Sequence, residues 1–169
     1  TFDKNFSLPV FIENDINAAA LGETILRNDP DFSNLFFLSI GTGTGAGLII
    51  NDRIWHGNMN YAGDVGMVMN ELDLVSLPGD FASLRLNNQI CVSAIEKRFC
   101  VDITHKIPCS EDKKQKISEY VVERFLPMIY NLNYILDITN YVLSGSLIDY
   151  LGDVVFDCTY RHLEQQQQF

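Results

Sequence analysis

Cysteine, positive charge and long apolar runs are all scarce in this sequence. The four cysteines form no Cys-x-x-Cys pair; they are Cys91, Cys100, Cys109 and Cys158. We therefore expect a cytoplasmic protein with reduced thiols, without a disulfide framework or a structural zinc site. No apolar run reaches the ~20 residues that a membrane-spanning helix needs, and no signal peptide precedes the first predicted strand. We therefore expect no membrane partner.

Acidic residues outnumber basic ones, with 22 Asp and Glu against 12 Lys and Arg and a formal net charge of −10. Contact with nucleic acid requires a basic face, so we expect no direct nucleic acid contact by this chain. The sequence is otherwise typical of a soluble globular protein, with 47% hydrophobic and 20% charged residues. Its 169 residues suffice for a single domain with a sizeable core.

Apolar runs and helical spacing predict an α/β fold in which helices flank a mixed sheet. We predict strands at 8–12, 34–40, 48–50, 53–55 and 141–143. We predict helices at 16–27, 90–99 and 113–136, and one more amphipathic helix after Ser146. Residues 165–169 form a tail rich in glutamine, which we expect to be disordered.

Asn14 and Asp15 lie at the junction between the first predicted strand and the helix that follows it. In open α/β folds small ligands bind at the carboxyl edge of the sheet, where such junctions lie. A carboxylate there can accept the proton of a sugar hydroxyl as its oxygen attacks phosphorus, and an amide can hydrogen-bond to neighbouring hydroxyls. The alternative is that either residue is only the N-cap of the helix, and the spacing alone favours this cap.

Glycine alternates with small residues from position 41 to position 47, in the order Gly41, Thr42, Gly43, Thr44, Gly45, Ala46, Gly47. Because glycine has no Cβ, such a turn lets backbone N–H groups approach a phosphate, and the threonine hydroxyls add donors. No lysine follows, which excludes a P-loop, and the strand after the turn excludes a dinucleotide fingerprint. A glycine-rich hairpin without any ligand is an equally open alternative.

Ser144, Gly145 and Ser146 lie between the last predicted strand and the helix after it. A nucleotide can bind at the helix N-terminus that such a turn creates. Strand-to-helix turns with glycine and serine are common, so this motif identifies nothing by itself.

Taken in order, these segments resemble the ROK family, which unites bacterial sugar kinases with sugar-responsive transcriptional repressors. Residues 13–23 match the family's E-N-D-x-N-A-A-A-L-G-E motif, and residues 41–47 match G-T-G-x-G-x-G. Residues 57–67 are similar to G-x-x-x-x-A-G-E-x-G-H, and 143–147 to a later glycine motif. The resemblance covers nearly the whole chain. It implies that residues 1–169 are one sugar- and nucleotide-binding lobe, the larger lobe of an actin-like (ribonuclease H-like) ATPase or sugar kinase fold.

The resemblance also implies roles for individual residues. Asp15 matches the catalytic base and, with Asn14 and Asp64, a sugar contact. Nucleotide contacts are implied at Gly41, Thr42, Gly43, Thr44, Gly45 and Gly145. The implied partners are a small-molecule sugar and a second copy of the chain, as a homodimer. ATP with Mg is implied only if kinase activity is retained.

The sequence departs from the family pattern in the segment after Gly57. The family's sugar-binding Glu is Asp64 here, and its His, which contacts both sugar and zinc, is Met67. Methionine cannot ligate zinc in a normal site. The C-x-C-G-x-x-G-C-x-E zinc loop is missing, because residues 68–90 contain no cysteine. We therefore expect no zinc, and we also expect the family's N-terminal lobe and any DNA-binding domain to lie outside this chain.

Three functions are compatible with these features. The eroded sugar contacts and the missing zinc loop favour the sugar-sensing, effector-binding domain of a ROK-type transcriptional regulator. The intact Asn14–Asp15 pair and glycine turn fit the lobe of an ATP-dependent kinase for a hexose or N-acetylhexosamine. A non-catalytic dimerisation scaffold is the third hypothesis. In each case we expect the isolated chain to be inactive, because phosphoryl transfer needs both lobes to hold the nucleotide and metal.

Overall fold

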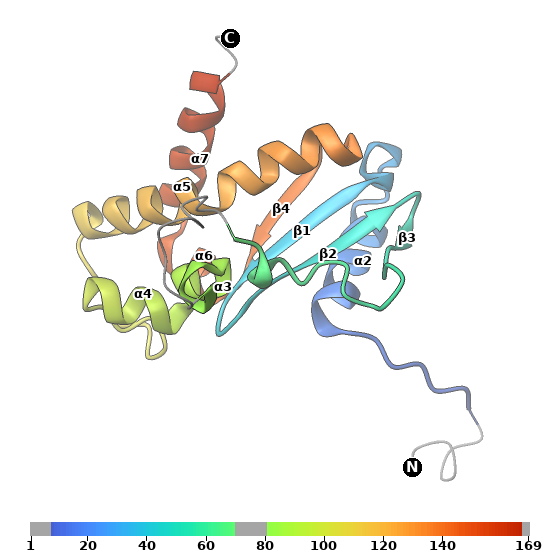
Figure 1. The fold of residues 1–169 in the computed structure, drawn as a ribbon, viewed down its shortest axis with the longest axis horizontal. Coiled ribbons are helices and arrows are strands. Elements are labelled where there is room, and N and C mark those ends of the chain that lie inside the picture. Colours follow the sequence, from blue (N-terminus) through green and yellow to red (C-terminus); the bar gives the residue numbers. More distant parts are fainter. Residues whose placement is uncertain (1–7, 70–80, 167–169) are drawn as a thin grey trace.

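A four-stranded mixed sheet forms the centre of the molecule (Figure 1). The computed structural model describes residues 8–69 and 81–166. The strands lie in the order β3-β2-β1-β4, with bounds β1 Leu35–Ile40, β2 Thr44–Ile50, β3 Arg53–Ile54 and β4 Tyr141–Ser144. β1 pairs antiparallel with β2 and parallel with β4, while β2 pairs antiparallel with β3. The predicted mixed sheet is confirmed.

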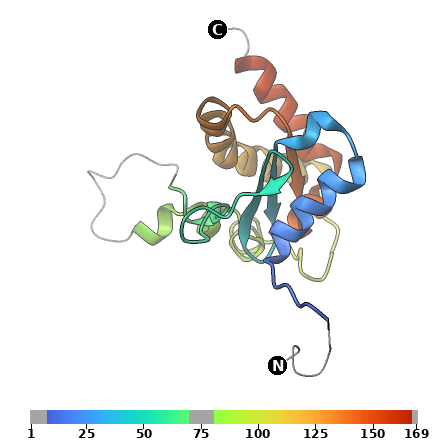
Figure 2. The same cartoon turned by 90° about the vertical axis from the view of Figure 1, so that its right-hand side faces the viewer.

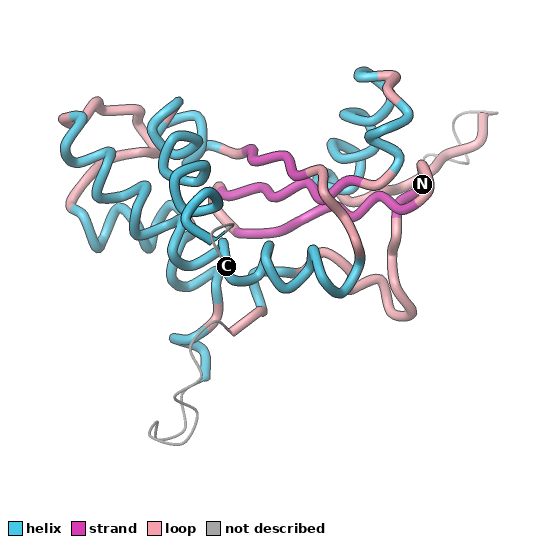
Figure 3. Tube along the Cα trace, turned by 90° about the horizontal axis from the view of Figure 1, so that it is seen from above, coloured by secondary structure: helices cyan, strands magenta, loops and turns pink. Residues whose placement is uncertain are grey.

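Helices cover both faces of this sheet. The α-helices are α2 Asp15–Arg27, α3 Leu86–Ile90, α4 Val92–Phe99, α5 Glu111–Leu136, α6 Ser146–Leu151 and α7 Asp153–Gln166. Short 3-10 helices are η1 Pro30–Ser33, η2 Val65–Met67 and η3 Phe81–Leu84. Figure 2 shows α2 and α3 on opposite sides of the sheet. Figure 3 shows most helices gathered at one end of the strands, apart from α2 and the C-terminal half of α5, which runs alongside the sheet. In the described residues no helix has the length and apolar character to cross a membrane.

β1 is buried on both faces, as its nearly continuous apolar run predicts. Successive side chains of a strand point to opposite faces. Phe36, Leu38 and Ile40 join the larger core with the helices that follow β3. Leu35 and Phe37 join a smaller core with α2. The strand that leads into the glycine turn is therefore held from both sides.

α2 lies unusually close to β2 because small residues face each other. Ala20 is fully buried, and a Cβ on Gly47 would lie only 2.5 Å from the Ala20 Cβ. Of the three adjacent alanines only Ala20 makes this contact, since Ala18 and Ala19 are exposed. This close packing places the N-terminus of α2 beside the turn between β1 and β2.

α5 is the longest helix of the described chain, and it begins two residues before the predicted helix start at Lys113. Ser110 is its N-cap, with a side-chain oxygen that accepts a hydrogen bond from the Lys113 N–H. It ends at Asp137, which adopts the left-handed conformation with φ 53°. Its buried residues recur at helical spacing, which confirms the predicted period; they are Ile117, Ser118, Val121, Val122, Phe125, Leu126, Met128 and Ile129.

The strand predicted at 8–12 is wrong. These residues form no ladder, and Phe11 and Ile12 are 90% and 95% exposed. Their β-forming side chains meet no strand within the described chain, and a strand needs a partner to exist. The apolar run favours a strand locally, but this segment has no partner strand in the described chain.

Three other element boundaries differ from the prediction. The glycine run does not form one turn, because β2 begins at Thr44 and contains Gly45 and Gly47. The helix predicted at 90–99 is divided at Cys91 into α3 and α4, and the helix after Ser146 is divided at Gly152 into α6 and α7. α7 continues through Gln166, and residues 167–169 of the predicted tail lie outside the described residues.

Candidate functional site

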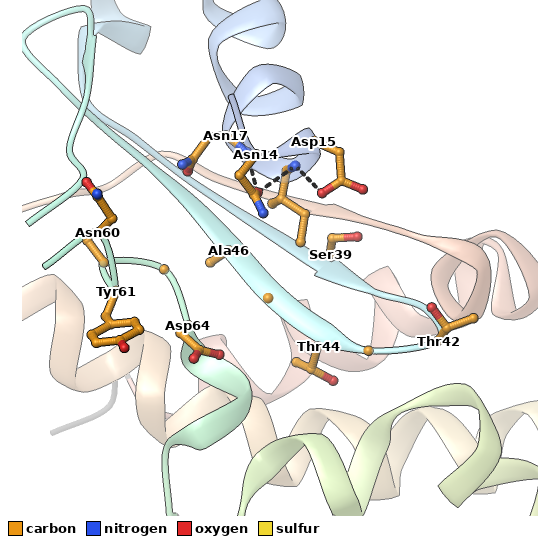
Figure 4. A pocket seen from close by; sticks show the side chains of 15 residues that line it. Asn14, Asp15, Asn17, Ser39, Thr42, Thr44, Ala46, Asn60, Tyr61 and Asp64 are labelled. Carbon is orange, nitrogen blue, oxygen red and sulfur yellow. Dashed lines mark hydrogen bonds between the residues drawn. The ribbon is translucent and has the colours of Figure 1, made fainter. Parts of the chain in front are cut away.

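A cavity of about 500 Å³, the Asp15 pocket, lies between the N-terminus of α2, the β1–β2 turn and the loop after β3 (Figure 4). Its lining residues are Asn14, Asp15, Ile16, Asn17, Ser39, Thr42, Gly43, Thr44, Gly45, Ala46, Asn60, Tyr61, Ala62, Gly63 and Asp64. It therefore gathers residues from three segments separated by up to fifty positions. Most of its side chains are polar, which suits a ligand rich in hydroxyl groups.

Asn14 and Asp15 share the helix N-terminus in two different roles. Asn14 is the N-cap of α2, and its Oδ1 accepts hydrogen bonds from the N–H groups of Ile16 (2.9 Å) and Asn17 (3.2 Å). Asp15 is the first helical residue, and one carboxylate oxygen accepts a second contact from the Ile16 N–H (2.9 Å). The cap interpretation is confirmed for Asn14, whose Nδ2 group stays available to donate. The exposed Asp15 carboxylate lines the pocket.

Glu13 fixes this helix start from outside the pocket. One of its oxygens accepts from the Asn14 N–H (2.9 Å) and from the Asn17 side-chain amide (3.0 Å). The other lies 2.8 Å from His56 Nε2. The hydrogen bonds from Asn17, His56 and the Asn14 backbone lower the pKa of Glu13 to about 2. The carboxylate is therefore ionised throughout the physiological range.

The turn between β1 and β2 is held from the opposite side by α3 and α4. The Thr44 N–H donates to Asn87 Oδ1 (2.9 Å), and the Val92 N–H donates to the Gly41 carbonyl (2.8 Å). The exposed residues between them, Thr42 and Gly43, line the pocket, and the Gly43 carbonyl accepts a hydrogen bond from the Gly41 N–H (2.8 Å). In the described chain the buried Thr44 hydroxyl has no hydrogen-bond partner. Such a group favours a ligand contact.

Gly63 anchors the wall that faces Asp15. Its φ is +90°, and its carbonyl accepts hydrogen bonds from the N–H groups of Ala46 and Val65, both at 2.7 Å. A Cβ at this position would lie 2.1 Å from the Ala46 carbonyl oxygen, so only glycine fits. Asp64 follows directly, and its exposed side chain makes no capping hydrogen bond and lines the pocket.

A second cavity of about 440 Å³, the Tyr150 pocket, adjoins the first at Thr42, which lines both. Its lining residues are Thr42, Val92, Ile103, Thr104, Lys106, Pro108, Lys114, Ser146, Asp149 and Tyr150. The Tyr150 hydroxyl donates to the Ile107 carbonyl (2.9 Å). Burial and a hydrogen bond with Cys109 raise the pKa of Tyr150 to about 12, so its ring stays neutral. Aliphatic groups and a neutral ring can enclose a flat aromatic ligand, and the lysines and hydroxyls can hold an anionic part.

The structure brings together most of the site residues that the sequence suggests. Asn14, Asp15, Asp64 and residues 42–45 all line the Asp15 pocket. Gly41 and Gly145 line neither pocket. A Cβ on Gly145 would lie 2.4 Å from the Ile40 carbonyl oxygen, so its φ of +104° already has a packing reason. Their nucleotide contacts, like the ligand roles of the others, stay predictions.

Sequence reasoning missed two groups of lining residues. Asn60 and Tyr61 immediately precede the Ala62–Asp64 segment, and this proximity is a signal that the sequence does offer. Ile103, Lys106 and Tyr150 of the second pocket offer no such signal, because they are scattered and look like ordinary core or surface residues.

No cluster of three or more histidine, cysteine, aspartate or glutamate side chains that could hold a metal occurs within residues 8–69 and 81–166. Met67, at the position of the family's histidine, is 48% exposed. The expectation that zinc is absent stays a prediction, which metal analysis of the purified protein tests. A Mg²⁺ ion brought by a nucleotide needs only one or two protein carboxylates, and Asp15 and Asp64 both face the first pocket.

Comparison with known proteins gives consistent results. The model of the ROK family matches residues 1–168. A beta-glucoside kinase from Listeria innocua is 30% identical over 152 residues, covering 83% of this chain and 51% of the kinase. A xylose repressor from Caldicellulosiruptor bescii is 44% identical over 63 residues, covering 37% of this chain and 16% of the repressor.

Among solved structures, a ROK family glucokinase from Streptomyces griseus in complex with glucose and AMPPNP matches with a TM-score of 0.69 at 18% identity. The match covers 96% of this chain and 60% of the glucokinase. This likeness confirms the predicted fold class, that of an actin-like ATPase or sugar kinase. The chain spans about half the length of the curated relatives that it matches along most of its sequence.

Proposed function

This chain belongs to the ROK family, and we propose that it is the sugar- and nucleotide-binding lobe of an ATP-dependent sugar kinase. One observation carries the proposal: the Asp15 pocket and the Tyr150 pocket meet at Thr42. A sugar sensor needs only the first pocket. A kinase also needs a nucleotide pocket that adjoins the sugar pocket, so that a phosphoryl group can pass from one bound substrate to the other. The sequence alone favours the regulator, but the paired pockets favour the kinase.

Asp15 is the proposed general base. Its carboxylate is exposed to the pocket and engages one of its oxygens in a hydrogen bond to the Ile16 N–H. The other oxygen can accept the proton of a sugar hydroxyl as that oxygen attacks the γ-phosphorus of ATP. The fixed start of α2 holds the carboxylate in place, and correct placement is the larger part of catalysis in phosphoryl transfer.

Asn14, Asn60 and Asp64 are the proposed sugar-orienting residues. They reach the pocket from two facing walls (Figure 4). Their amides and carboxylate can donate to and accept from neighbouring hydroxyls, which fixes the orientation of the ring. The beta-glucoside kinase named above matches 83% of this chain at 30% identity, which supports a β-glucoside or another hexose derivative as substrate.

The Tyr150 pocket is the proposed site for the nucleotide. Val92, Ile103 and Pro108 with the Tyr150 ring fit a purine, while Lys106 and the Ser146 hydroxyl fit the phosphates. Thr42 and Gly43 then face the transferred group at the junction. A bound Mg²⁺ would neutralise phosphate charge, and Asp64 would be the carboxylate that holds it, because both oxygens of Asp15 already have partners in this proposal.

A phosphorylation assay on the natural full-length protein tests the proposal. ATP is supplied with glucose, an aryl β-glucoside and N-acetylmannosamine, and ADP release is measured. We expect sugar-dependent ADP release with at least one of the three. Sugar binding by calorimetry without any ADP release contradicts the kinase function. No binding of either sugar or nucleotide leaves only the scaffold hypothesis.

The effector-binding domain of a transcriptional regulator is the second candidate. It is favoured by the 44% identity to a xylose repressor over 63 residues and by Met67 in place of the family's histidine. A regulator releases operator DNA when sugar binds, so gel-shift titration of the full-length protein with its own promoter distinguishes it. The homodimer and the cytoplasmic location remain predictions, which light scattering and cell fractionation measure.

A further inference from the structure

We propose that Glu13 and His56 form a clasp that holds the loop 56–64 against the start of α2 and so sets the spacing between Asp15 and Asp64. Neither residue lines the Asp15 pocket. They are separated by 43 positions, yet Glu13 Oε2 and His56 Nε2 lie 2.8 Å apart. The inference rests on the proposed function in one respect, namely that the pocket between the two walls binds a sugar.

Glu13 connects the clasp to the catalytic wall. It directly precedes Asn14 and Asp15, and its other oxygen holds the Asn14 N–H and the Asn17 amide. Asn17 is 8% exposed and also lines the pocket. A carboxylate with three short contacts has little freedom to move. A displacement of the Glu13 carboxylate therefore also displaces the first turn of α2.

His56 connects the clasp to the opposite wall. Its carbonyl accepts a hydrogen bond from the Ala62 N–H (3.2 Å), which closes the loop on itself. Gly57 has a φ of +71°, and a Cβ added to it would lie 3.4 Å from the Ala62 Cβ. The far end of the loop is fixed on β2 by the Gly63 carbonyl and the Ala46 N–H. The near end is fixed on β2 by the Trp55 N–H and the Leu48 carbonyl (2.7 Å). The Glu13 carboxylate adds a link from this end of the loop to the residues that start α2, so the clasp adjusts how the two walls face each other.

The proton of the clasp lies on the histidine. An ionised carboxylate can only accept a hydrogen bond, so His56 Nε2 must carry a hydrogen in this contact. That holds for the neutral ring and for the charged ring alike. Asp15 and Asp64 are the other charged groups facing the Asp15 pocket, and neither is bonded to His56. The clasp therefore persists across neutral pH.

Both partners are partly exposed, with 42% of the His56 side chain and 32% of the Glu13 side chain accessible. Such a pair contributes little to global stability. Its effect should appear in the position of the loop, and hence in sugar affinity. An effect on sugar affinity without an effect on global stability would distinguish a positioning role of the clasp from a purely structural role.

The test uses His56→Ala, Glu13→Ala and the conservative His56→Gln, whose amide can still donate to Glu13. His105→Ala is the matched control, because His105 makes an equivalent contact with a carboxylate (Nδ1 to Asp102 Oδ1, 2.9 Å) and lines neither pocket. Two readouts are measured on the full-length protein: amide hydrogen exchange of residues 57–64 without ligand, and the Kd of the best sugar by calorimetry.

We expect His56→Ala and Glu13→Ala to lose exchange protection in 57–64 and to weaken sugar binding about tenfold, as loss of a hydrogen bond to a charged group does. KM for the sugar should rise while kcat changes little, His56→Gln should recover most of the affinity, and His105→Ala should match the wild type. The double variant should be no weaker than either single variant.

Unchanged exchange in 57–64, or unchanged sugar affinity, overturns the clasp. The exchange readout needs no ligand and no turnover. It therefore decides whether the clasp holds the loop even in a protein that fails the phosphorylation assay, and the two failures remain distinguishable.

Discussion

The two pockets that meet at Thr42 are built in different ways. The Asp15 pocket is polar and is assembled from short continuous segments, each with its own motif. The Tyr150 pocket is assembled from five separate parts of the chain, and its walls combine aliphatic groups and an aromatic ring with lysines and hydroxyls. Polar site residues therefore occur in short motifs that can be recognised in the sequence. An apolar pocket wall forms only when distant elements pack together, so the sequence does not reveal it.

The largest effect is expected from Asp15→Asn, which removes the proton acceptor and retains the shape of the side chain. Loss of a general base should lower kcat by about 10³, with sugar and nucleotide affinities nearly unchanged. Steady-state ADP release and calorimetry measure the two quantities. The control is Asp52→Asn, the same change at an exposed turn outside both pockets.

A variant that keeps its kcat would contradict the catalytic role of Asp15 and would leave a binding role only. That result would make the Asp15 pocket a sensor and would favour the regulator. Activity abolished by the substitution overturns the regulator-only interpretation.

Gly63→Ala should distort the backbone that forms one wall of the Asp15 pocket. The added Cβ lies 2.1 Å from the Ala46 carbonyl oxygen at a φ of +90°, so we expect a loss of about 3 kcal/mol in the free energy of unfolding. Gly22→Ala is the matched control, since no atom lies within 4 Å of its added Cβ in α2. It should stabilise the protein by about 1 kcal/mol. Urea denaturation measures the free energy of unfolding of both variants. Equal changes in the two variants would contradict the clash at Gly63.

Tyr150→Ala should separate the two pockets. Removal of the ring takes away a stacking surface worth ~1 kcal/mol, so the Kd of a non-hydrolysable ATP analogue should rise up to about tenfold. The Kd of the sugar should not change. Tyr150→Phe retains the ring and should bind the analogue almost as well as the wild type. If sugar affinity falls instead, the assignment of the two pockets is wrong.

The sequence predicts the fold class and the Asp15 pocket because both depend on local signals. The apolar run of β1 and the helical period of α5 specify their elements, and the segments at 13–23 and 41–47 specify the facing parts of the pocket. Thr42 is predicted as a phosphate contact through its backbone N–H and its hydroxyl. That it joins two cavities follows only from the placement of α3, α4 and α6 around the turn.

What the sequence predicts wrongly has a physical reason in each case. Residues 8–12 have strand-forming side chains but meet no partner strand in the described chain. The glycines at 45 and 47 are read as a turn, whereas β2 uses them to admit α2, since a Cβ at either position lies within 2.7 Å of Ile16 or Ala20. The local preference of a residue for strand or turn does not predict where the neighbouring helix packs.

The smallest effect concerns the acid dependence of Glu13, which belongs to the clasp and not to either pocket lining. Its pKa falls from 4.5 to about 2 on folding, so the ionised form stabilises the native state. That contribution is fully present above pH 4.5 and is lost as the pH falls towards 2. Glu13→Gln should therefore be less stable than the wild type at pH 6, and the difference should shrink between pH 4.5 and pH 2. Urea midpoints across this range measure it, with Glu164→Gln, an exposed glutamate at the end of α7, as the baseline. A difference that is constant with pH would show that ionisation of Glu13 adds no stability, and would refute the lowered pKa of its carboxyl.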